Sequence, residues 1–368
     1  MKNIPLTLFL SGDVMSGRGI DQVLPYSVDP QLFEPHIKNA KRYVEFAENH
    51  SGTIPRKVAY DYIWGEALKE LNRQKPQVKI INLETSITSS DNCWNQKDIH
   101  YRMHPKNVDL LVTAGIDVCL LGNNHVMDWG YDGLTETLDI LSEKKIMTAG
   151  AGKNETSAAK PAIIETSNGR LLVFSYATQS AGIPTSWKAE SNKAGVNLLE
   201  DTEIEGVKKV IDDISSFYKD SDRVILSIHW GSNFGYEIPH WQRDFAHRIL
   251  EEGIVDIIHG HSSHHPKGIE LYNERLILYG CGDLINDYEG IKGYEEYRDD
   301  LSLLYFPILS ASGALLSLIM TPMNINGFRL RNAVEKDIQW LADRLNRECR
   351  KLETSILRTD DGRLQLSW

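Results

Sequence analysis

The sequence predicts an α/β fold, in which a largely parallel sheet core is covered by helices on both faces, from three observations. Short, continuously apolar segments, of which 6–10 and 78–82 come first, alternate with longer amphipathic ones. Parallel strands that are covered on both faces have this uninterrupted apolar character. The chain of 368 residues is 41% hydrophobic and 25% charged, as expected of a globular protein with a deep core. Several of the apolar segments end in Asp, Glu, Asn or His, residue types that collect at strand ends in open α/β sheets.

The first half of the chain is predicted to supply three buried strands and two helices. Residues 6–10 are too few for the apolar core of a signal peptide, so we expect them to form the first strand. The polar stretch 21–60 contains four prolines and is expected to be a loop or helical insertion. The other elements expected in this half are a helix at 61–72, strands at 78–82 and 117–121, and an amphipathic helix at 131–144.

The second half repeats the alternation and adds antiparallel pairs. Residues 162–165 and 171–176 are predicted strands on either side of Ser167-Asn168-Gly169, a typical hairpin turn. Residues 301–320 carry no charge, but a proline, a glycine and four serines interrupt them, so we expect two strands and a turn instead of a membrane-spanning helix. The other expected elements are helices at 203–218, 241–252 and 335–352, and strands at 223–229, 255–259, 276–279 and 364–366.

A single mixed domain spanning residues 1–368 is the organisation that we expect. The sequence has no internal repeat and no low-complexity tract that would divide it. In this interpretation 21–60 decorates the domain, and 335–368 ends it with a helix and a strand.

Charge and cysteine usage exclude some classes of function. The chain has 40 basic and 51 acidic side chains, and a net charge of −11 repels phosphate backbones, which argues against nucleic-acid binding. The four cysteines are widely spaced and form no Cys-x-x-Cys pair, a usage typical of reduced thiols in a cytoplasm. We therefore expect a cytoplasmic protein without a membrane span. Its oligomeric state is left open.

Five polar clusters directly follow expected strands, and they are the main evidence for a functional site. Carboxylate and amide oxygens suit Mg²⁺, Mn²⁺ or Ca²⁺, whereas imidazoles suit Zn²⁺, Fe²⁺ or Mn²⁺. If the strand ends are neighbours, the clusters converge on one cleft and predict one or two divalent metal ions. The clusters are Gly12-Asp13, Asn82-Leu83-Glu84, Asn123-Asn124-His125, His229-Trp230-Gly231 and the histidine-rich segment 259–265.

These motifs resemble those of the CapA family, bacterial capsule or poly-γ-glutamate synthesis proteins of the calcineurin-like metallophosphoesterase superfamily. The resemblance runs from about residue 6 to about residue 290. Its most specific part is the Asn-Asn-His-x-x-Asp-x-Gly element at 123–130. It implies an α/β/β/α sandwich of two mixed sheets flanked by helices, with metal ions at the strand ends.

The resemblance also implies roles for individual residues. His125 stands where the superfamily keeps a general acid or electrostatic stabiliser, and Asp128 is placed to orient it. Arg18 is a candidate for binding an anionic substrate group through its guanidinium, and Asn123 and His265 are further candidates for substrate contact. The metal ligands implied by the resemblance are Asp13, Glu84, Asn124, His229, His261 and His264.

Two features depart from the superfamily pattern. Asp13 is followed by Val14 and Met15, where the superfamily has Asp-x-His, so the first metal position lacks an imidazole. This loss leaves the number of bound ions open. The histidine-rich loop contains adjacent His264 and His265, so either can be the ligand.

Each site residue also has a structural alternative. Asp13 can cap a turn, and the two asparagines of 123–124 can stabilise a loop in the left-handed conformation. His229 can be a hydrogen-bonded core histidine, and Arg18 can be held in a salt bridge.

A metal-dependent hydrolase is the leading functional hypothesis, acting on a phosphoester or on a γ-glutamyl or other amide bond of an anionic or peptide substrate. In this hypothesis His125 protonates the leaving group. A second hypothesis is a peptide epimerase, in which Asp13 and a histidine act as opposed base and acid. A third is a non-catalytic component that binds an acidic polymer in polyglutamate synthesis.

Overall fold

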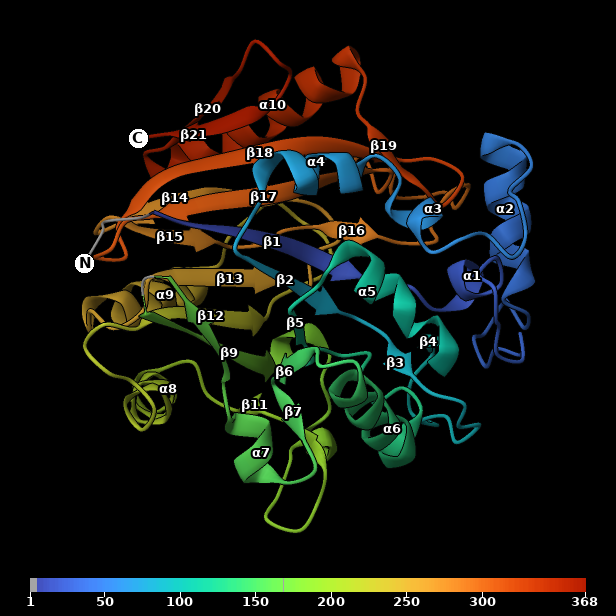
Figure 1. The fold of residues 1–368 in the computed structure, drawn as a ribbon, viewed down its shortest axis with the longest axis horizontal. Helices are drawn as coiled ribbons and strands as arrows, with labels where there is room; N and C mark the ends of the chain where they lie inside the picture. The colour runs from blue at the N-terminus through green and yellow to red at the C-terminus, as the bar shows by residue number, and fades with distance from the viewer. Residues whose placement is uncertain (1–4, 168) are drawn as a thin grey trace.

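Two mixed β-sheets packed face to face, with helices on both outer faces, make up the fold (Figure 1). This arrangement, seen in a computed structural model, is the α/β/β/α sandwich expected from the resemblance. The structure describes residues 5–167 and 169–368, so Asn168 of the predicted turn lies outside the described residues. The predicted hairpin itself is present, because Thr166 and Gly169 are paired across it.

The parallel half of the larger sheet supplies one edge of the site. Its strands, in spatial order, are β1 (Leu6–Val14), β2 (Val78–Leu83), β5 (Val118–Leu120) and β6 (Met147–Ala149). Parallel pairing brings their carboxyl ends together, so Asp13 lies opposite Asn82. A short strand, β16 (Asp283–Ile285), pairs with the same end of β1 and places Asp283 opposite Asp13.

The antiparallel half of the larger sheet confirms the expected hairpin within 301–320. Strands β17 (Leu301–Leu309) and β18 (Leu315–Ile325) form that hairpin, and β17 pairs with β1. Among the described residues, no helix has the length and apolar character needed to cross a membrane. The sheet continues with β19 (Leu330–Asn332), β21 (Leu364–Ser367) and β20 (Ser355–Arg358), the last of which was not predicted.

The smaller sheet supplies the opposite edge of the site. Its central strands are parallel, and His229 at the end of one lies opposite His261 at the end of its neighbour. The strands are β8 (Ala162–Thr166), β9 (Gly169–Thr178), β11 (Leu198–Leu199), β12 (Arg223–His229), β13 (Ile257–His261), β14 (Ile269–Tyr272) and β15 (Arg275–Leu278).

Three apolar layers hold the sandwich together, one between the sheets and one beneath the helices on each outer face. Between the sheets, Leu10 of β1 and Ile257 of β13 belong to one buried cluster. On the outer face of the smaller sheet, Leu226 packs in a cluster with Phe245 of α9. Each such side chain contributes about 1.5–3 kcal/mol when it is removed from water. Helices α8 (Ile204–Ser215) and α9 (His240–Glu251) cover this face, and α10 (Glu335–Cys349) joins the cluster between the sheets.

The helices on the outer face of the larger sheet differ from the sequence prediction at one point. The predicted helix at 61–72 is two helices, because Gly65 has a φ of +48° and a side chain there would lie 2.2 Å from the carbonyl oxygen of Leu330. The helices of this region are α1 (Arg18–Asp21), α2 (Lys41–Ser51), α3 (Asp61–Trp64), α4 (Ala67–Gln74), α5 (Asp109–Ala114) and α6 (Gly130–Glu143), whereas α7 (Glu155–Ala159) packs against the short strands β7 (Ala151–Gly152) and β10 (Gly195–Val196). The short strands β3 (Ser86–Ile87) and β4 (Arg102–Met103) complete the structure.

Both sheets direct the carboxyl ends of their parallel strands to the same side of the molecule. Figure 1 shows β1, β2 and β13 pointing to the side on which α1 and α2 lie. The two sheets are joined near this end, since Nε2 of His259 on β13 lies 2.8 Å from the carbonyl oxygen of Ser11 on β1. The strand ends of both sheets therefore meet, as the sequence analysis expected.

Candidate metal centre

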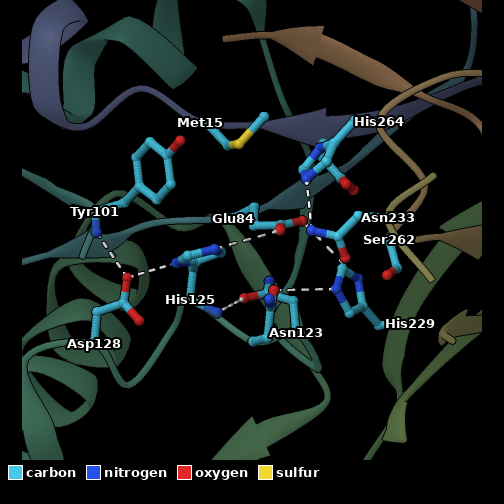
Figure 2. Close-up of polar contacts among 12 residues, drawn as sticks. Met15, Glu84, Tyr101, Asn123, His125, Asp128, His229, Asn233, Ser262 and His264 are labelled. Carbon is cyan, nitrogen blue, oxygen red and sulfur yellow. Dashed lines mark hydrogen bonds and ion pairs between the residues drawn. The ribbon is translucent and has the colours of Figure 1, made fainter. Parts of the chain in front are cut away.

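The side chains expected to bind metal come from both sheets and meet at the seam between them. Figure 2 shows Glu84, His229 and His264 around a common space, with His125 beside them. Glu84 Oε2 lies 3.9 Å from His229 Nδ1, and Asn124 Oδ1 lies 3.1 Å from His229 Nε2. Asp13 completes the cluster, because it belongs to two groups of neighbouring ligand atoms.

The first group consists of Asp13, His229 and His261. One ligand atom from each of these residues lies within 4.8 Å of the others. The Nδ1 atoms of the two histidines are 2.7 Å apart. On the far side of its ring, His261 Nε2 lies 2.7 Å from the hydroxyl of Ser227, which orients the imidazole. All three members are fully buried.

The second group consists of Asp13, His264 and Asp283, again with ligand atoms within 4.8 Å of one another. His264 Nδ1 lies 2.9 Å from Asp283 Oδ1, and its Nε2 lies 3.1 Å from the amide nitrogen of Asn233. The sequence analysis did not select Asp283. Its Gly-Asp pair follows an apolar strand as Gly12-Asp13 does, and that repetition was the signal available.

Asn82 holds the two predicted carboxylate ligands in place. Its amide nitrogen donates to Asp13 Oδ1 at 2.7 Å and to Glu84 Oε2 at 2.8 Å. Its oxygen accepts a hydrogen bond from Asn123 at 3.0 Å. Asn82 was named in the sequence only as part of a cluster, yet it links the ends of β1 and β2.

The pKa shifts of three buried groups indicate that the cluster lacks a positive charge to balance its carboxylates. Burial, and then the carboxylate of Asp283, raise the pKa of Asp13 to about 7. Burial and Asp13 raise the pKa of Glu84 well above its usual range. Burial opposes a charge on His264, but the carboxylate of Asp283 outweighs this effect and raises its pKa. Like charges held together in this way need either protons or a cation.

The donor set fits a divalent cation. Oδ2 of Asp13 is buried and finds no hydrogen-bond partner among the described residues. Burial keeps the pKa values of His229 and His261 well below 6.5, so both imidazoles are neutral and have lone pairs to donate. Carboxylates, an amide oxygen and neutral imidazoles are the ligands that Mn²⁺, Fe²⁺ and Zn²⁺ accept in proteins.

His125 lies beside the cluster and is held by Asp128. Its Nδ1 is 2.6 Å from Asp128 Oδ2, which also accepts the backbone N–H of Tyr101 at 2.7 Å. Since a carboxylate only accepts, the proton sits on Nδ1, and Nε2 faces Glu84 Oε1 at 4.0 Å (Figure 2). Burial, assisted by the neighbouring Lys97, lowers the pKa of His125 to about 4, against the effect of Asp128.

Lys97 is a site residue that the sequence analysis missed. Its ammonium group donates to Asp128 Oδ1 at 2.6 Å and to the backbone carbonyl of Asn124, and it lies 3.2 Å from His125 Nδ1. Lys97 therefore connects Asp128 to the loop that carries Asn124 and His125. No motif surrounds this lysine in the sequence, so only the fold reveals it.

Asn123 has a structural role in place of the predicted substrate contact. Its side chain is fully buried, and its oxygen accepts the backbone N–H groups of His125 and Val126 at 3.1 and 3.0 Å. Its nitrogen donates to the carbonyl of Leu83 at 2.9 Å. These bonds shape the loop that presents His125.

Arg18 is held in a buried ion-pair network, which corrects the prediction that its guanidinium meets the substrate. It bonds both carboxylate oxygens of Asp287, and its Nη1 lies 3.1 Å from Glu34 Oε1. The guanidinium also lies over the ring of Tyr43, with its carbon 3.7 Å from the ring centroid. Because Glu34 and Tyr43 belong to the predicted insertion, Arg18 fastens that segment to the rest of the fold.

Geometry favours His264 over His265 as the candidate ligand. His264 faces Asp13 and Asp283, as described above. The ring of His265 instead packs against Tyr297 and Tyr236, with centroids 4.7 and 4.3 Å away. Its Nδ1 lies 3.3 Å from the adjacent backbone carbonyl. The predicted substrate contact by His265 has no support from this packing.

Comparisons with known proteins identify relatives of the chain. A family model described as "Bacterial capsule synthesis protein PGA_cap" matches residues 7–288, a span that includes every residue of both groups. The chain is 41% identical over 367 residues to a protein of Mycobacterium tuberculosis named a probable polyglutamine synthesis accessory protein, and the match covers 98% of this chain and 96% of that protein.

Two further relatives are more distant. The PGA biosynthesis protein CapA of Bacillus subtilis is 27% identical over 316 residues, which cover 86% of this chain and 70% of the relative. The capsule biosynthesis protein CapA of Bacillus anthracis is 22% identical over 330 residues, which cover 88% and 68%.

Proposed function

The chain belongs to the PGA_cap family of bacterial capsule synthesis proteins, the CapA family, and from this premise we propose that it is a metal-dependent hydrolase. Its substrate in this proposal is an anionic or peptide molecule of capsule or polyglutamate metabolism, cleaved at a phosphoester or a γ-glutamyl or other amide bond. The observation that carries the proposal is the position of Asp13, which is shared by two groups of ligand atoms beside His125.

Metal ions in this proposal are held by the side chains at the seam of the two sheets. The proposed ligands are Asp13, Glu84, Asn124, His229, His261 and His264. One or two divalent ions bound there supply a positive charge that polarises a phosphoryl or acyl oxygen and lowers the pKa of water.

In this proposal His125 acts first as a proton acceptor and then as the proton donor that the sequence suggested. A pKa of about 4 leaves the imidazole neutral near pH 7, with Nε2 free to accept a proton. It takes the proton of the attacking water and then returns it to the leaving group. Asp128 fixes the Nδ1–H tautomer and stabilises the imidazolium that forms between these two steps.

An accessory, non-catalytic role is the second candidate, because the relative from Mycobacterium tuberculosis is named an accessory protein. In that role the chain binds an acidic polymer without cleaving it. Binding of the polymer then survives replacement of the metal ligands, whereas the hydrolase loses its turnover. The peptide epimerase hypothesis and the cytoplasmic location both stay predictions.

Replacement of His125 by alanine tests the hydrolase. We expect His125→Ala to lower hydrolysis of bis(p-nitrophenyl) phosphate or γ-glutamyl-p-nitroanilide by about 10²–10⁴-fold, the usual contribution of a positioned acid or base. The metal content, measured by mass spectrometry of the purified protein, should not change. The control is His36→Ala, which removes an exposed histidine of the insertion.

Two results count against the proposal. If His125→Ala hydrolyses these substrates as fast as the unmodified protein, the role of His125 is wrong. If the unmodified protein retains no divalent metal and cleaves neither substrate, the accessory role is preferred.

A further inference from the structure

The strand pair β1–β16 places two buried carboxylates directly beside each other. Asp13 lies opposite Asp283 in a parallel register, and neither is more than 2% exposed. The approach depends on Gly12, since a side chain at that position would lie 1.6 Å from the carbonyl oxygen of Gly282. That carbonyl accepts the backbone N–H of Asp13 at 2.9 Å. The fold thus brings two like charges together in a place shielded from water, which is unfavourable without a counter-charge.

Neighbouring side chains do not supply that counter-charge in full. Asn286 donates to Asp283 Oδ2 at 3.0 Å, but an amide is neutral. Among the described residues, the ion-pair partner of Asp283 is His264 alone, at 2.9 Å. Oδ2 of Asp13 has no hydrogen-bond partner there, although it is fully buried. One imidazole therefore faces two carboxylates, and one carboxylate oxygen is unpartnered.

Met15, two residues after Asp13, contributes neither an oxygen nor a nitrogen ligand. The superfamily pattern has a histidine at this position, and the thioether that replaces it is buried, with its sulfur 3.6 Å from the hydroxyl of Tyr288. A soft thioether is a poor ligand for the hard ions Mn²⁺ and Mg²⁺. Asp283, on a different strand, brings a carboxylate oxygen into the group formed with Asp13 and His264.

We propose that Asp283 is a metal ligand and that it forms an oxygen-rich subsite with Asp13 and His264. Compared with a histidine at position 283, the carboxylate shifts the preference of this subsite from Zn²⁺ towards Mn²⁺ or Mg²⁺. This inference rests on the proposed function, because it assumes that the seam binds metal. It adds a ligand that neither the sequence motifs nor the family comparison assigns. Carboxylate oxygens suit hard ions, whereas each imidazole shifts a site towards Zn²⁺.

A positioning role is the alternative that the test must separate. In that case Asp283 only accepts a hydrogen bond from His264 Nδ1 and orients the ring, as carboxylates often do behind a metal-bound histidine. Asp283→Asn keeps an acceptor and the same shape but removes the charged ligand. Asp283→His supplies a ligand of the other type. Asp299→Asn is the control, since it makes the same substitution at a nearby carboxyl group that belongs to neither group of ligand atoms.

The experiment is calorimetric titration of the metal-free full-length protein with Mn²⁺ and separately with Zn²⁺. We expect Asp283→Asn to weaken Mn²⁺ binding by at least about tenfold or to abolish one Mn²⁺ equivalent, since even residues behind the ligands change affinity by about 10–100-fold. Asp283→His should bind metal again, with the ratio of Zn²⁺ to Mn²⁺ affinity raised by at least about tenfold. Asp299→Asn should stay within about threefold of the unmodified protein. Thermal melts confirm that each variant is folded.

The failure of this inference is distinguishable from the failure of the proposed function. If the unmodified protein binds Mn²⁺ and Asp283→Asn binds it with the same affinity and stoichiometry, Asp283 is not a ligand. If Asp283→His changes both affinities equally, its role is positional and the inference is also overturned. If the unmodified protein binds neither ion, the proposed metal centre itself is wrong.

Discussion

The two sheets contribute chemically different halves of the site. Every candidate ligand from the larger sheet and its loops, namely Asp13, Glu84, Asn124 and Asp283, offers oxygen. From the smaller sheet, His229 and His261 offer nitrogen, and His264 follows on the loop after β13. Neither sheet alone holds a mixed set. The comparison shows that the packing of the sheets against each other makes the site, while the register within each sheet only aligns ligands of one kind.

Burial acts in opposite directions on the two halves. On the oxygen half it raises the pKa of Asp13 to about 7 and that of Glu84 further, so these groups retain protons. On the nitrogen half it lowers the pKa values of His229 and His261, so these rings stay neutral. A bound cation replaces the protons on the carboxyl groups of the oxygen half. It requires no change in the protonation of the histidines of the nitrogen half. The metal-free site is therefore kept nearly neutral by protons on its carboxylates.

Among the predicted effects on metal binding and hydrolysis, we expect the largest from the replacement of Asp13 in the oxygen half. Asp13→Asn keeps the shape but removes the one side chain shared by both groups. We expect a loss of about 10³-fold or more in hydrolysis and a loss of bound metal, because a bound ion contributes several kcal/mol to the transition state. The metal-free variant should unfold at the same temperature as the metal-free parent or higher at pH 8, since a buried charge is removed. Unchanged metal content would show that Asp13 is not the shared ligand.

Replacement of Ser227 should weaken the nitrogen half to a smaller extent. Ser227→Ala removes the hydroxyl that lies 2.7 Å from His261 Nε2, and we expect metal affinity to fall by about 10–100-fold. The matched control is Ser175→Ala on β9, directly opposite in the sheet, whose hydroxyl has no hydrogen-bond partner among the described residues. Calorimetric titration with Mn²⁺ compares the two variants. Equal Mn²⁺ affinities of the two variants would mean that the hydroxyl of Ser227 is not needed to orient His261.

The pH dependence of stability should show the buried histidines His125 and His259 opposing Asp13. The pKa values of His125 and His259 are about 4 in the fold, mainly because of burial, against about 6.5 in an unfolded chain. Between these values the unfolded chain binds more protons, so their contribution to stability is lost as the pH falls. Asp13 acts oppositely, because its pKa is raised, and its contribution is lost as the pH rises from about 4 to about 7.

Urea unfolding of the metal-free protein between pH 7 and pH 5 measures this balance. Asp13→Asn removes the opposing contribution, so the variant should lose stability more steeply on acidification than the parent does. The expected difference in slope is about 1 kcal/mol per pH unit. Equal slopes for the two proteins would show that Asp13 does not retain a proton in the fold.

Most of the site could be predicted from the sequence because strand ends are visible there. An apolar run that ends in Asp13, Glu84 or His229 predicts that this polar side chain lies at the edge of a sheet. Asp283 escaped because three residues separate it from the apolar run 276–279, so it does not end that run directly. Lys97 lies in a loop, and its partners, Asp128 and the backbone carbonyl of Asn124, lie 31 and 27 positions away in the sequence.

Contacts between residues far apart in the sequence could not be predicted from local sequence patterns. Arg18 meets Asp287 across 269 positions, and no local pattern foretells that pair. The break in the predicted helix at 61–72 has the same origin, because the backbone of Leu330 leaves room only for Gly65. Local periodicity predicts that an element exists, whereas tertiary contacts decide where it ends.

Diffraction from crystals grown with Mn²⁺, recorded near the manganese absorption edge, tests the meeting of the two halves most directly. The account predicts an anomalous peak in contact with both Asp13 and a histidine of the smaller sheet. Clear Mn²⁺ peaks at other places only, or well-ordered crystals with no peak beside Asp13 at saturating Mn²⁺, would contradict it.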